Sequence, residues 1–315
     1  MYPHQAMLGS ELSRRQFVQG AMGLGAWSLA GGLANAEKPA DGWIDAHVHV
    51  WTGDTERYPL KAGMTKDRMA VPSFTPEELF AHTGPCGVRR IVLIQMSYYG
   101  SDNSYMLDAM ERHRGVFAGV AIVNENDHPC KSMLALADKG VRGFRLRPSG
   151  PSADDWFASP PLTAMFRCGA EHGLAMCLLV DPEHLPAVDR MAKKNPDTPI
   201  VIDHFARIGA GGEIREPDVD ALCGLAKNRN VCVKTSAFYA LGKKKAPYLD
   251  LAPMIRRLLD AFGPPRLMWA SDSPFQVINE HTYRDSLDLI RSRIDFLSDS
   301  DRQWLLGKTA DRLFF

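Results

Sequence analysis

The sequence predicts an α/β fold, a (β/α)8 TIM barrel, on the strength of three observations. Eight short apolar runs, typical of buried parallel strands, alternate with helix-like segments between residues 44 and 270. Polar side chains lie at the ends of these runs, and a barrel would bring those side chains together at one mouth. No internal repeat or interdomain linker interrupts the pattern. A doubly wound open sheet is the alternative, but no glycine-rich phosphate loop follows the first run.

The strands are expected at the apolar runs and the helices in the segments between them. The strand ranges are Ile44–Val50, Arg90–Gln95, Phe117–Val123, Gly143–Leu146, Leu174–Val180, Ile200–Asp203, Val231–Thr235 and Leu267–Ala270. The helix ranges are Pro76–His82, Ser104–Arg114, Pro129–Lys139, Pro161–His172, Pro182–Asn195, Pro217–Asn228 and Leu251–Phe262. Several of these segments begin with proline, which the first turn of a helix tolerates because its N–H would be unpaired there anyway.

The first segment of the chain is expected to lie outside this fold. Residues 13–18, SRRQFV, have the twin-arginine form, residues 21–33 are a short apolar stretch rich in Gly and Ala, and residues 34–36, ANA, fit a cleavage site. The apolar stretch is too short to span a bilayer comfortably. We therefore expect residues 1–38 to be a twin-arginine (Tat) signal peptide with a short linker and residues 39–315 to be one domain. The Tat machinery would export it to a bacterial periplasm, without stable membrane association after cleavage.

The composition argues against some classes of partner and indicates the state of the cysteines. The 37 Lys and Arg balance the 37 Asp and Glu, which argues against a nucleic-acid or bulk-membrane partner. None of the six cysteines forms a C-x-x-C pair, and several lie inside apolar runs such as residues 175–179. We therefore expect buried, inert thiols rather than a disulfide framework, although an oxidising compartment permits a bridge.

Two histidines at the end of the first strand are the strongest functional signal. Alternate residues of a strand point to the same side, so His47 and His49 aim both imidazoles at one spot. Neutral imidazoles that converge suit a divalent metal or the carbonyl group of a substrate.

Polar residues at the ends of later strands are expected to meet this pair at the barrel mouth. Asp272 follows the last strand, which lies beside the first in a closed barrel, and it can act as a general base or ligate a metal. His204 ends strand 6 and can complete a ligand set or donate to a carbonyl oxygen, whereas Asp203 is expected to point the other way and to be structural. The remaining strand-end residues are Gln95, Ser97, Arg145, Arg147, Lys234 and Ser236.

Residues of strands 4 and 5 indicate the charge of the substrate and the number of metal ions. Arg145 and Arg147 share one side of strand 4, where a guanidinium reads a carboxylate or phosphate, while Arg142 is expected to be solvated or paired with a helix. Strand 5 is apolar throughout, without the histidine that binuclear metallohydrolase barrels place there. A single Zn or Mn ion on His47, His49 and Asp272, with an open coordination position, or no metal at all, is therefore expected.

Several ordered motifs resemble one known family. His47-x-His49, residues 141–145 (VRGFR), 201–204 (VIDH), 269–274 (WASDSP) and 307–314 (GKTADRLF) look like those of the amidohydrolase-related (amidohydrolase 2) family. Residues 95–103, QMSYYGSDN, and 203–207, DHFAR, are similar to segments of its 2-pyrone-4,6-dicarboxylate lactonase-like branch. The resemblance covers the chain from about residue 43 to its end.

The resemblance implies a distorted TIM barrel that hydrolyses a lactone. It assigns the scissile carbonyl to His47, His49 and His204, water activation to Asp272 and substrate carboxylates to Arg145, with Ser97 and Arg207 as lesser contacts. The chain departs from the branch in two places. Residues 178–180, LLV, replace a tyrosine on strand 5, and residues 238–243, FYALGK, replace an arginine after strand 7.

The preferred hypothesis is therefore a periplasmic hydrolase of a lactone of a small carboxylated compound. A metal-dependent decarboxylase of the same superfamily is the nearest alternative, and it would need bound zinc. An amide or phosphoester hydrolase is a further alternative. A barrel that binds its ligand without turnover would be favoured if Asp272 were turned away from His47.

Overall fold

The computed structural model describes residues 42–149 and 152–315. The predicted signal peptide and linker, residues 1–38, lie outside the described residues, as does the predicted cleavage site. Within the described ranges, none of the helices has the length and apolar character needed to cross a membrane. Export and cleavage therefore stay predictions.

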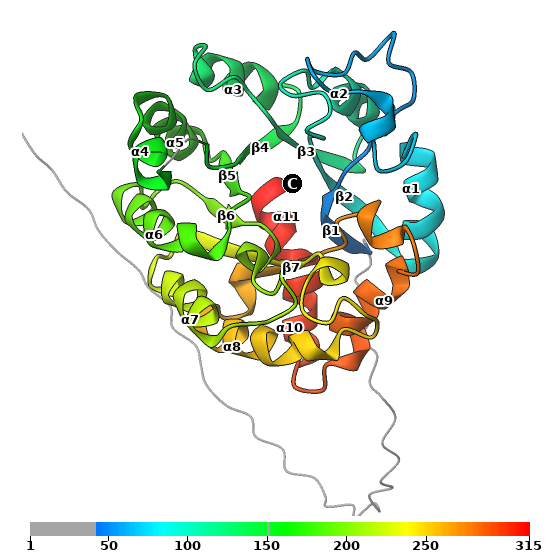
Figure 1. The fold of residues 1–315 in the computed structure, drawn as a ribbon, viewed down its shortest axis with the longest axis vertical. Coiled ribbons are helices and arrows are strands. Elements are labelled where there is room, and N and C mark those ends of the chain that lie inside the picture. Colours follow the sequence, from blue (N-terminus) through cyan, green and yellow to red (C-terminus); the bar gives the residue numbers. More distant parts are fainter. Residues whose placement is uncertain (1–41, 150–151) are drawn as a thin grey trace, which may run out of the picture. The chain divides into compact units, whose positions relative to one another are not determined.

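Eight parallel strands form the centre of the fold, each hydrogen-bonded to the next in chain order (Figure 1). Val48 and Ser273 form a parallel bridge that brings the first strand to the last and closes the ring. The predicted (β/α)8 barrel is thereby confirmed. The strands are β1 (Trp43–Val48), β2 (Val88–Ile94), β3 (Phe117–Ala121), β4 (Val141–Leu146), β5 (Ala175–Leu178), β6 (Ile200–Ile202), β7 (Val231–Ser236) and β8 (Leu267–Ala270).

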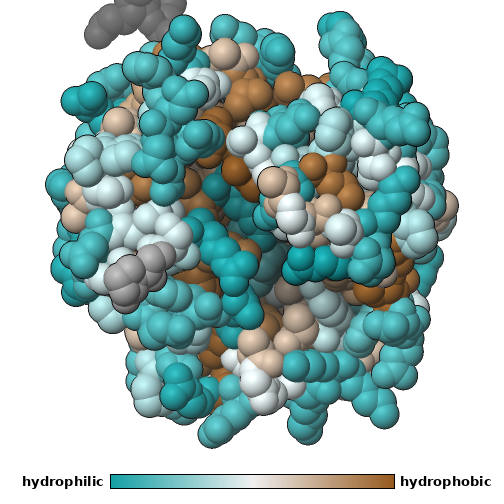
Figure 2. Space-filling view, turned by 45° about the horizontal axis from the view of Figure 1, so that its top comes forward, coloured by the Kyte–Doolittle hydropathy of each residue, from teal (hydrophilic) through white to brown (hydrophobic). Residues whose placement is uncertain are grey.

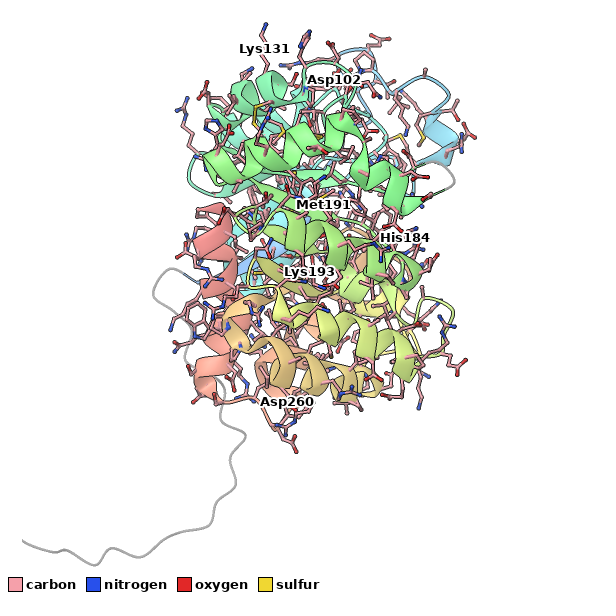
Figure 3. All side chains as sticks on the ribbon, turned by 90° about the vertical axis from the view of Figure 1, so that its left-hand side faces the viewer. Asp102, Lys131, His184, Met191, Lys193 and Asp260 are labelled. Carbon is pink, nitrogen blue, oxygen red and sulfur yellow. A yellow bond between two sulfur atoms is a disulfide. The ribbon has the colours of Figure 1, made fainter. Side chains whose placement is uncertain are left out.

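Helices surround the strands as an outer layer, as Figure 1 shows. Proline stands in the first turn of α1, and Thr75 and Glu78 form a capping box there. In Figure 3, Met191 and Lys193 mark α6 and Asp260 marks α8 within this layer. The helices on the expected segments are α1 (Pro76–Thr83), α2 (Ser104–Arg112), α3 (Pro129–Ala137), α5 (Pro160–His172), α6 (Leu185–Lys194), α7 (Glu216–Gly224) and α8 (Ala252–Phe262).

Further helices lie outside the expected segments. α4 (Ala153–Ala158) is inserted between β4 and α5, and α9 (Tyr283–Asp288), α10 (Asp299–Gln303) and α11 (Thr309–Phe314) follow β8. Ala310 and Phe314 of α11 pack in one cluster with inward-facing residues of the barrel such as Ile44 and Cys232. Because those strand residues lie near the amino ends of β1 and β7, α11 closes that end, and the opposite end is left for the site.

The expectation of inert thiols is wrong for two of the six cysteines. Cys130 on α3 and Cys168 on α5 form a disulfide with a Cα–Cα distance of 5.7 Å. The two helices are neighbours on the barrel wall, a proximity that spacing in the sequence does not reveal. The other cysteines are free: Cys86, Cys177 and Cys232 are buried, and Cys223 is half-buried.

Candidate active site

A cavity of about 740 Å³ opens at the carboxyl ends of the strands. His49, His204 and Asp272 line its inner part, with Arg145 beside them. Apolar side chains such as Leu179 complete the wall. In the space-filling view the molecule is hollowed, and hydrophilic and hydrophobic residues both border the hollow (Figure 2). Cavities of this size and mixed lining are typical of small-molecule sites.

His47, His49 and Asp272 converge at the inner end of the cavity. The two Nε2 atoms lie 3.2 Å apart. Oδ1 of Asp272 lies 3.5 Å from Nε2 of His47 and 3.4 Å from Nε2 of His49. The closing contacts between β1 and β8 hold them there, because Asp272 N donates to His47 O at 2.9 Å and His49 N donates to Ser273 O at 2.8 Å. Asp272 is therefore turned toward His47, and the condition that favours a barrel without turnover is not met.

The hydrogen bonds of His49 determine its tautomer. Nδ1 lies 2.8 Å from the carbonyl oxygen of Ile94, which can only accept, so Nδ1 carries the proton. Nε2 of His49 then presents a lone pair toward Asp272 and His47. This atom can ligate a cation or accept a proton.

The three converging atoms fit a single divalent metal ion. Zinc–nitrogen bonds of about 2.0–2.1 Å in a tetrahedron place ligand atoms about 3.3 Å apart. The separations among His47 Nε2, His49 Nε2 and Asp272 Oδ1 are 3.2, 3.5 and 3.4 Å. Two imidazoles and a carboxylate are also ligands that zinc and manganese accept.

Asp203 does not point away from the site, which corrects the expectation from strand alternation. Its Oδ1 lies 3.4 Å from Nδ1 of His47 and 3.0 Å from Nζ of Lys234, and both charged side chains are fully buried. Burial would raise the pKa of Asp203, but the Lys234 ammonium and the contact with His47 hold it well below its usual range. Burial, together with the Lys234 ammonium, holds the pKa of His47 well below its ordinary value. A neutral His47 suits a ligand or an acceptor.

A left-handed turn explains how both Asp203 and His204 reach the site. The chain leaves β6 at Ile202, and His204 through Arg207 all have positive φ, from 52° to 58°. The turn breaks the alternation of the strand and returns the His204 imidazole to the cavity. Nδ1 of His204 pairs with the Ser236 hydroxyl at 2.8 Å, and Nε2 lies 3.8 Å from Oδ2 of Asp272.

The two oxygens of Asp272 have different surroundings. Oδ1 faces the β1 histidines, whereas Oδ2 accepts a hydrogen bond from the Tyr239 hydroxyl at 2.7 Å. Burial would raise the pKa of Asp272, but His204, His49 and His47 hold it below its usual range. Burial and the neighbouring Asp272 carboxylate raise the pKa of Tyr239, so its hydroxyl stays protonated and donates.

The expected substrate contacts lie around the same cavity. Nη1 of Arg145 lies 3.3 Å from Nε2 of His49, and Arg147 and Ser97 line the cavity from more exposed positions. Arg207 also lines it but pairs with Asp181 at 2.9 Å. Arg142 instead donates to the carbonyl oxygen of Ala137 at the end of α3, and of the two expected environments, solvent or a helix, it therefore has the helix.

Tyr239, and the roles of Lys234 and Asp203, were not identified from the sequence. A signal for Lys234 exists, because an ammonium group inside the apolar run Val231–Thr235 needs a buried partner. Tyr239 lies in residues 238–243, where the chain departs from the lactonase branch. This departure is the signal in the sequence that points to Tyr239.

Comparisons with known proteins show the family to which the chain belongs. A family model described as Amidohydrolase matches residues 44–315. The chain is 32% identical over 240 residues to L-fucono-1,5-lactonase of Burkholderia ambifaria, covering 76% of this chain and 82% of that protein. It is 28% identical over 268 residues to a 2-pyrone-4,6-dicarboxylate hydrolase of Comamonas testosteroni, covering 81% and 85%.

A solved structure shares the fold. A Burkholderia multivorans amidohydrolase with bound zinc superposes with a TM-score of 0.73 at 22% identity. The match covers 86% of this chain and 98% of that one. At this identity the likeness concerns the barrel itself.

Proposed function

Because the chain belongs to the amidohydrolase family, we propose that it hydrolyses the ring ester of a small carboxylated lactone. The observation that carries the proposal is the meeting of His47, His49 and Asp272 at the inner end of the cavity, next to Arg145. The names of two relatives add support, since one acts on a sugar lactone and the other on a pyrone dicarboxylate.

Each residue of the site has its own part in the proposed hydrolysis. The ester carbonyl oxygen lies near the imidazoles of His47, His49 and His204. His204, whose Nε2 faces the cavity, would donate a hydrogen bond to that oxygen as charge develops on it, whereas the Nε2 lone pair of His49 stays directed at Asp272 and His47. Water attacks the carbonyl carbon while Asp272 takes its proton. The bond between the carbonyl carbon and the ring oxygen then breaks, and Asp272 returns the proton to the departing oxygen. The product is an open-chain hydroxy acid.

His47, His49 and Asp272 are the residues that would hold a divalent ion, zinc or manganese. When bound, the ion would polarise the ester carbonyl as a Lewis acid. The bound zinc in the related barrel supports this assignment. Oδ2 of Asp272, which faces Tyr239, would stay outside this ligand set.

Arg145 supplies the carboxylate preference. Among the described residues its guanidinium has no carboxylate within ion-pair distance, and its nearest polar partner is His49. A guanidinium at the cavity wall binds a planar carboxylate through paired hydrogen bonds. The substrate would therefore place a carboxylate beside the scissile ester.

A lactone panel together with metal analysis tests the proposal. The purified protein would be assayed by proton release against a carboxylated lactone, 2-pyrone-4,6-dicarboxylate, and against L-fucono-1,5-lactone, which carries no charge. Untreated protein would be analysed for zinc and manganese. We expect hydrolysis of at least one of these lactones above the rate with Asp272→Asn, and turnover of L-fucono-1,5-lactone alone would contradict the carboxylate preference. Absence of turnover with every lactone, after reconstitution with each metal, would refute the proposal.

We further propose that the Tat machinery exports the protein to the periplasm. The twin-arginine segment at residues 13–18 motivates this, and the Cys130–Cys168 disulfide supports an oxidising compartment. Fractionation of cells that express the full chain tests it. The wild-type chain should appear in the periplasmic fraction, and replacement of Arg14 and Arg15 by Lys should retain it in the cytoplasm. Equal distribution of both chains would contradict export by this route.

A further inference from the structure

The cavity contains a second pair of polar residues that hydrolysis does not use. Glu125 follows β3, and Trp156 lies on the inserted helix α4. Both line the cavity, and the Trp156 indole N–H donates to Oε1 of Glu125 at 3.2 Å. Trp156 is only 7% exposed, and its ring centroid lies 4.9 Å from that of Phe157. The indole is thus fixed, and it holds the carboxylate at the cavity wall.

Glu125 brings a second carboxylate into the cavity, away from Asp272 and the histidines, and among the described residues this carboxylate has no cationic partner. Within the described part of the chain, no Lys, Arg or His side chain lies within 4.0 Å of its carboxylate, although other carboxylates of the molecule have such partners. Oε1 is occupied by the indole, so Oε2 is free to accept from a ligand. Arg145, Arg147 and Arg207 line the same cavity.

Glu125 and Trp156 lie nearer the cavity entrance than the residues that we assign to hydrolysis. Arg145 lies within β4, whereas Glu125 comes after the neighbouring strand β3 has ended at Ala121. Because parallel strands advance toward the mouth together, Glu125 is further out than Arg145. One cavity therefore offers a cation beside the histidines and an anion nearer its entrance.

The cavity is larger than a single lactone ring needs. A volume of about 740 Å³ corresponds to roughly 25 water molecules at about 30 Å³ each. A six-membered lactone with one carboxylate has about a dozen non-hydrogen atoms. The substrate thus has room for an extension that reaches the outer part, and Leu146 and Leu179 add apolar wall to the cavity.

We propose that Glu125 and Trp156 form an outer subsite that binds an uncharged, hydroxylated extension of the lactone, and that Glu125 selects against a second carboxylate. The proposal rests on the lactonase function above. A free carboxylate oxygen accepts hydrogen bonds from hydroxyl groups, and the apolar wall accommodates C–H faces of a polyol. A second carboxylate on the substrate would meet the like charge of Glu125. An ammonium group on the substrate would be repelled by the positive charges of Arg145, Arg147 and Arg207, which line the same cavity.

Binding of open-chain acids tests the outer subsite without requiring turnover. Calorimetry would compare two open-chain acids of similar length. L-fuconate has one carboxylate, which can pair with Arg145 while its hydroxyl groups reach Glu125, whereas adipate has no hydroxyl group and would place its second carboxylate near Glu125. The variants are Glu125→Gln, which removes the charge, and Trp156→Phe, which removes the indole N–H. Glu213→Gln is the matched control, because Glu213 is exposed and does not line the cavity.

We expect Glu125→Gln to weaken L-fuconate binding about tenfold and to strengthen adipate binding, since hydrogen bonds to a charged group are about twice as strong as neutral ones. Trp156→Phe should weaken L-fuconate binding by less. The Glu213→Gln control should behave as wild type. Parallel changes for both acids, no change, or no measurable binding of L-fuconate to the wild-type protein would overturn the subsite.

Kinetics separate this inference from the function on which it rests. If lactones are hydrolysed, Glu125→Gln should shift the ratio of kcat/KM for hydroxylated and dicarboxylated lactones at least tenfold toward the dicarboxylate. If the ratio stays constant, the subsite is wrong and the lactonase function stands. If no lactone is hydrolysed but the binding preference shifts as expected, the subsite stands and the lactonase function is wrong.

Discussion

At the scale of single residues, Asp272 combines three properties that a catalytic base needs. It lies at the inner end of the cavity, it is ionised because imidazoles lower its pKa, and its Oδ2 is held by the Tyr239 hydroxyl. Its positive φ of 64° turns the side chain toward the β1 histidines. The conformation and the hydrogen bond together fix which oxygen faces the substrate.

Asp272→Asn should abolish turnover and leave the fold intact. The amide keeps the shape of the side chain but cannot take a proton from water, and loss of a positioned base costs about two to four decades in rate. Steady-state kinetics measure the loss, and circular dichroism with product binding serves as the control. Turnover close to that of the wild type would remove Asp272 from the base role.

Arg145→Lys should raise KM for carboxylated lactones by roughly one to two decades, because a charged hydrogen bond contributes about 1.5–3 kcal/mol and Lys lacks the planar fork. A neutral lactone should be nearly unaffected. Parallel kinetics on both substrates check the prediction. Equal losses would show instead that the Arg145–His49 contact at 3.3 Å positions the imidazole.

Asp45 makes the stability of the protein depend on pH. Burial raises the pKa of the Asp45 carboxyl to about 6. The hydrogen bonds that it accepts from His47 N, Ser271 N and the Tyr283 hydroxyl act in the opposite direction but are outweighed. The unfolded value is about 3.9, so the folded state binds more protons between about pH 4 and 6. The stability contributed by this group is therefore present at low pH and is lost as pH rises through that window.

Asp45→Asn should remove this dependence. Relative to the wild type, the variant should gain about 3 kcal/mol of unfolding free energy between about pH 4 and 6.5. Urea unfolding at several pH values, read as the difference between the two proteins, cancels other titrations. A difference that does not change with pH would contradict the raised pKa.

At the scale of elements, the left-handed turn of His204–Arg207 determines the chemistry more than the strand before it. Left-handed conformations cost non-glycine residues about 1–2 kcal/mol each. Phe205 and Ala206 adopt them while fully buried, so packing against the rest of the barrel holds the turn. Because of this turn, two consecutive residues, Asp203 and His204, both reach the site.

Ala206→Val should disrupt this turn. A β-branched side chain at φ 53° adds strain, and overpacking of a fully buried position adds about 1–3 kcal/mol. We expect a loss of roughly 2 kcal/mol or more in urea unfolding, with a fall in kcat as His204 moves. Ala206→Gly is the matched control and should stay within about 1 kcal/mol of the wild type. Similar stability and kcat in both variants would show that the turn tolerates strain.

At the scale of the whole molecule, the barrel holds a buried ion pair beneath its site. Lys234 on β7 and Asp203 after β6 are both fully buried at 3.0 Å, and the Phe314 ring of α11 lies 5.8 Å from the Lys234 ammonium on the closed side. Such pairs are costly to desolvate, so their presence beneath His47 suits a role in orienting that imidazole rather than in stability.

Lys234→Met should destabilise the protein by about 3–5 kcal/mol, because it leaves the Asp203 carboxylate buried and unpaired. The double variant Lys234→Met, Asp203→Asn should recover much of that loss while it stays impaired in turnover. Thermal and urea unfolding of the three proteins check this. A double variant no more stable than the single one would show that Lys234 acts by packing alone.

Much of the fold and part of the site follow from local patterns. Apolar runs that alternate with proline-started helices predict every strand of the barrel, since burial on both faces selects continuous apolar strands. The strand-end positions of His47, His49 and Asp272 predict one mouth, because parallel strands in a barrel end at the same face. The inserted helix α4 and the Tyr239 contact carry no comparable periodic signal.

Local patterns of sequence thus decide the barrel and the candidates for its mouth, because strand and helix periods depend on neighbouring residues. Only the tertiary structure decides which side chains meet. The positive φ values at His204 and Asp272 override strand alternation, the Cys130–Cys168 bridge joins neighbouring helices, and Glu125 meets Trp156 at the cavity wall. Each of these depends on segments far apart in the chain, whose distances are fixed by packing rather than by spacing in the sequence.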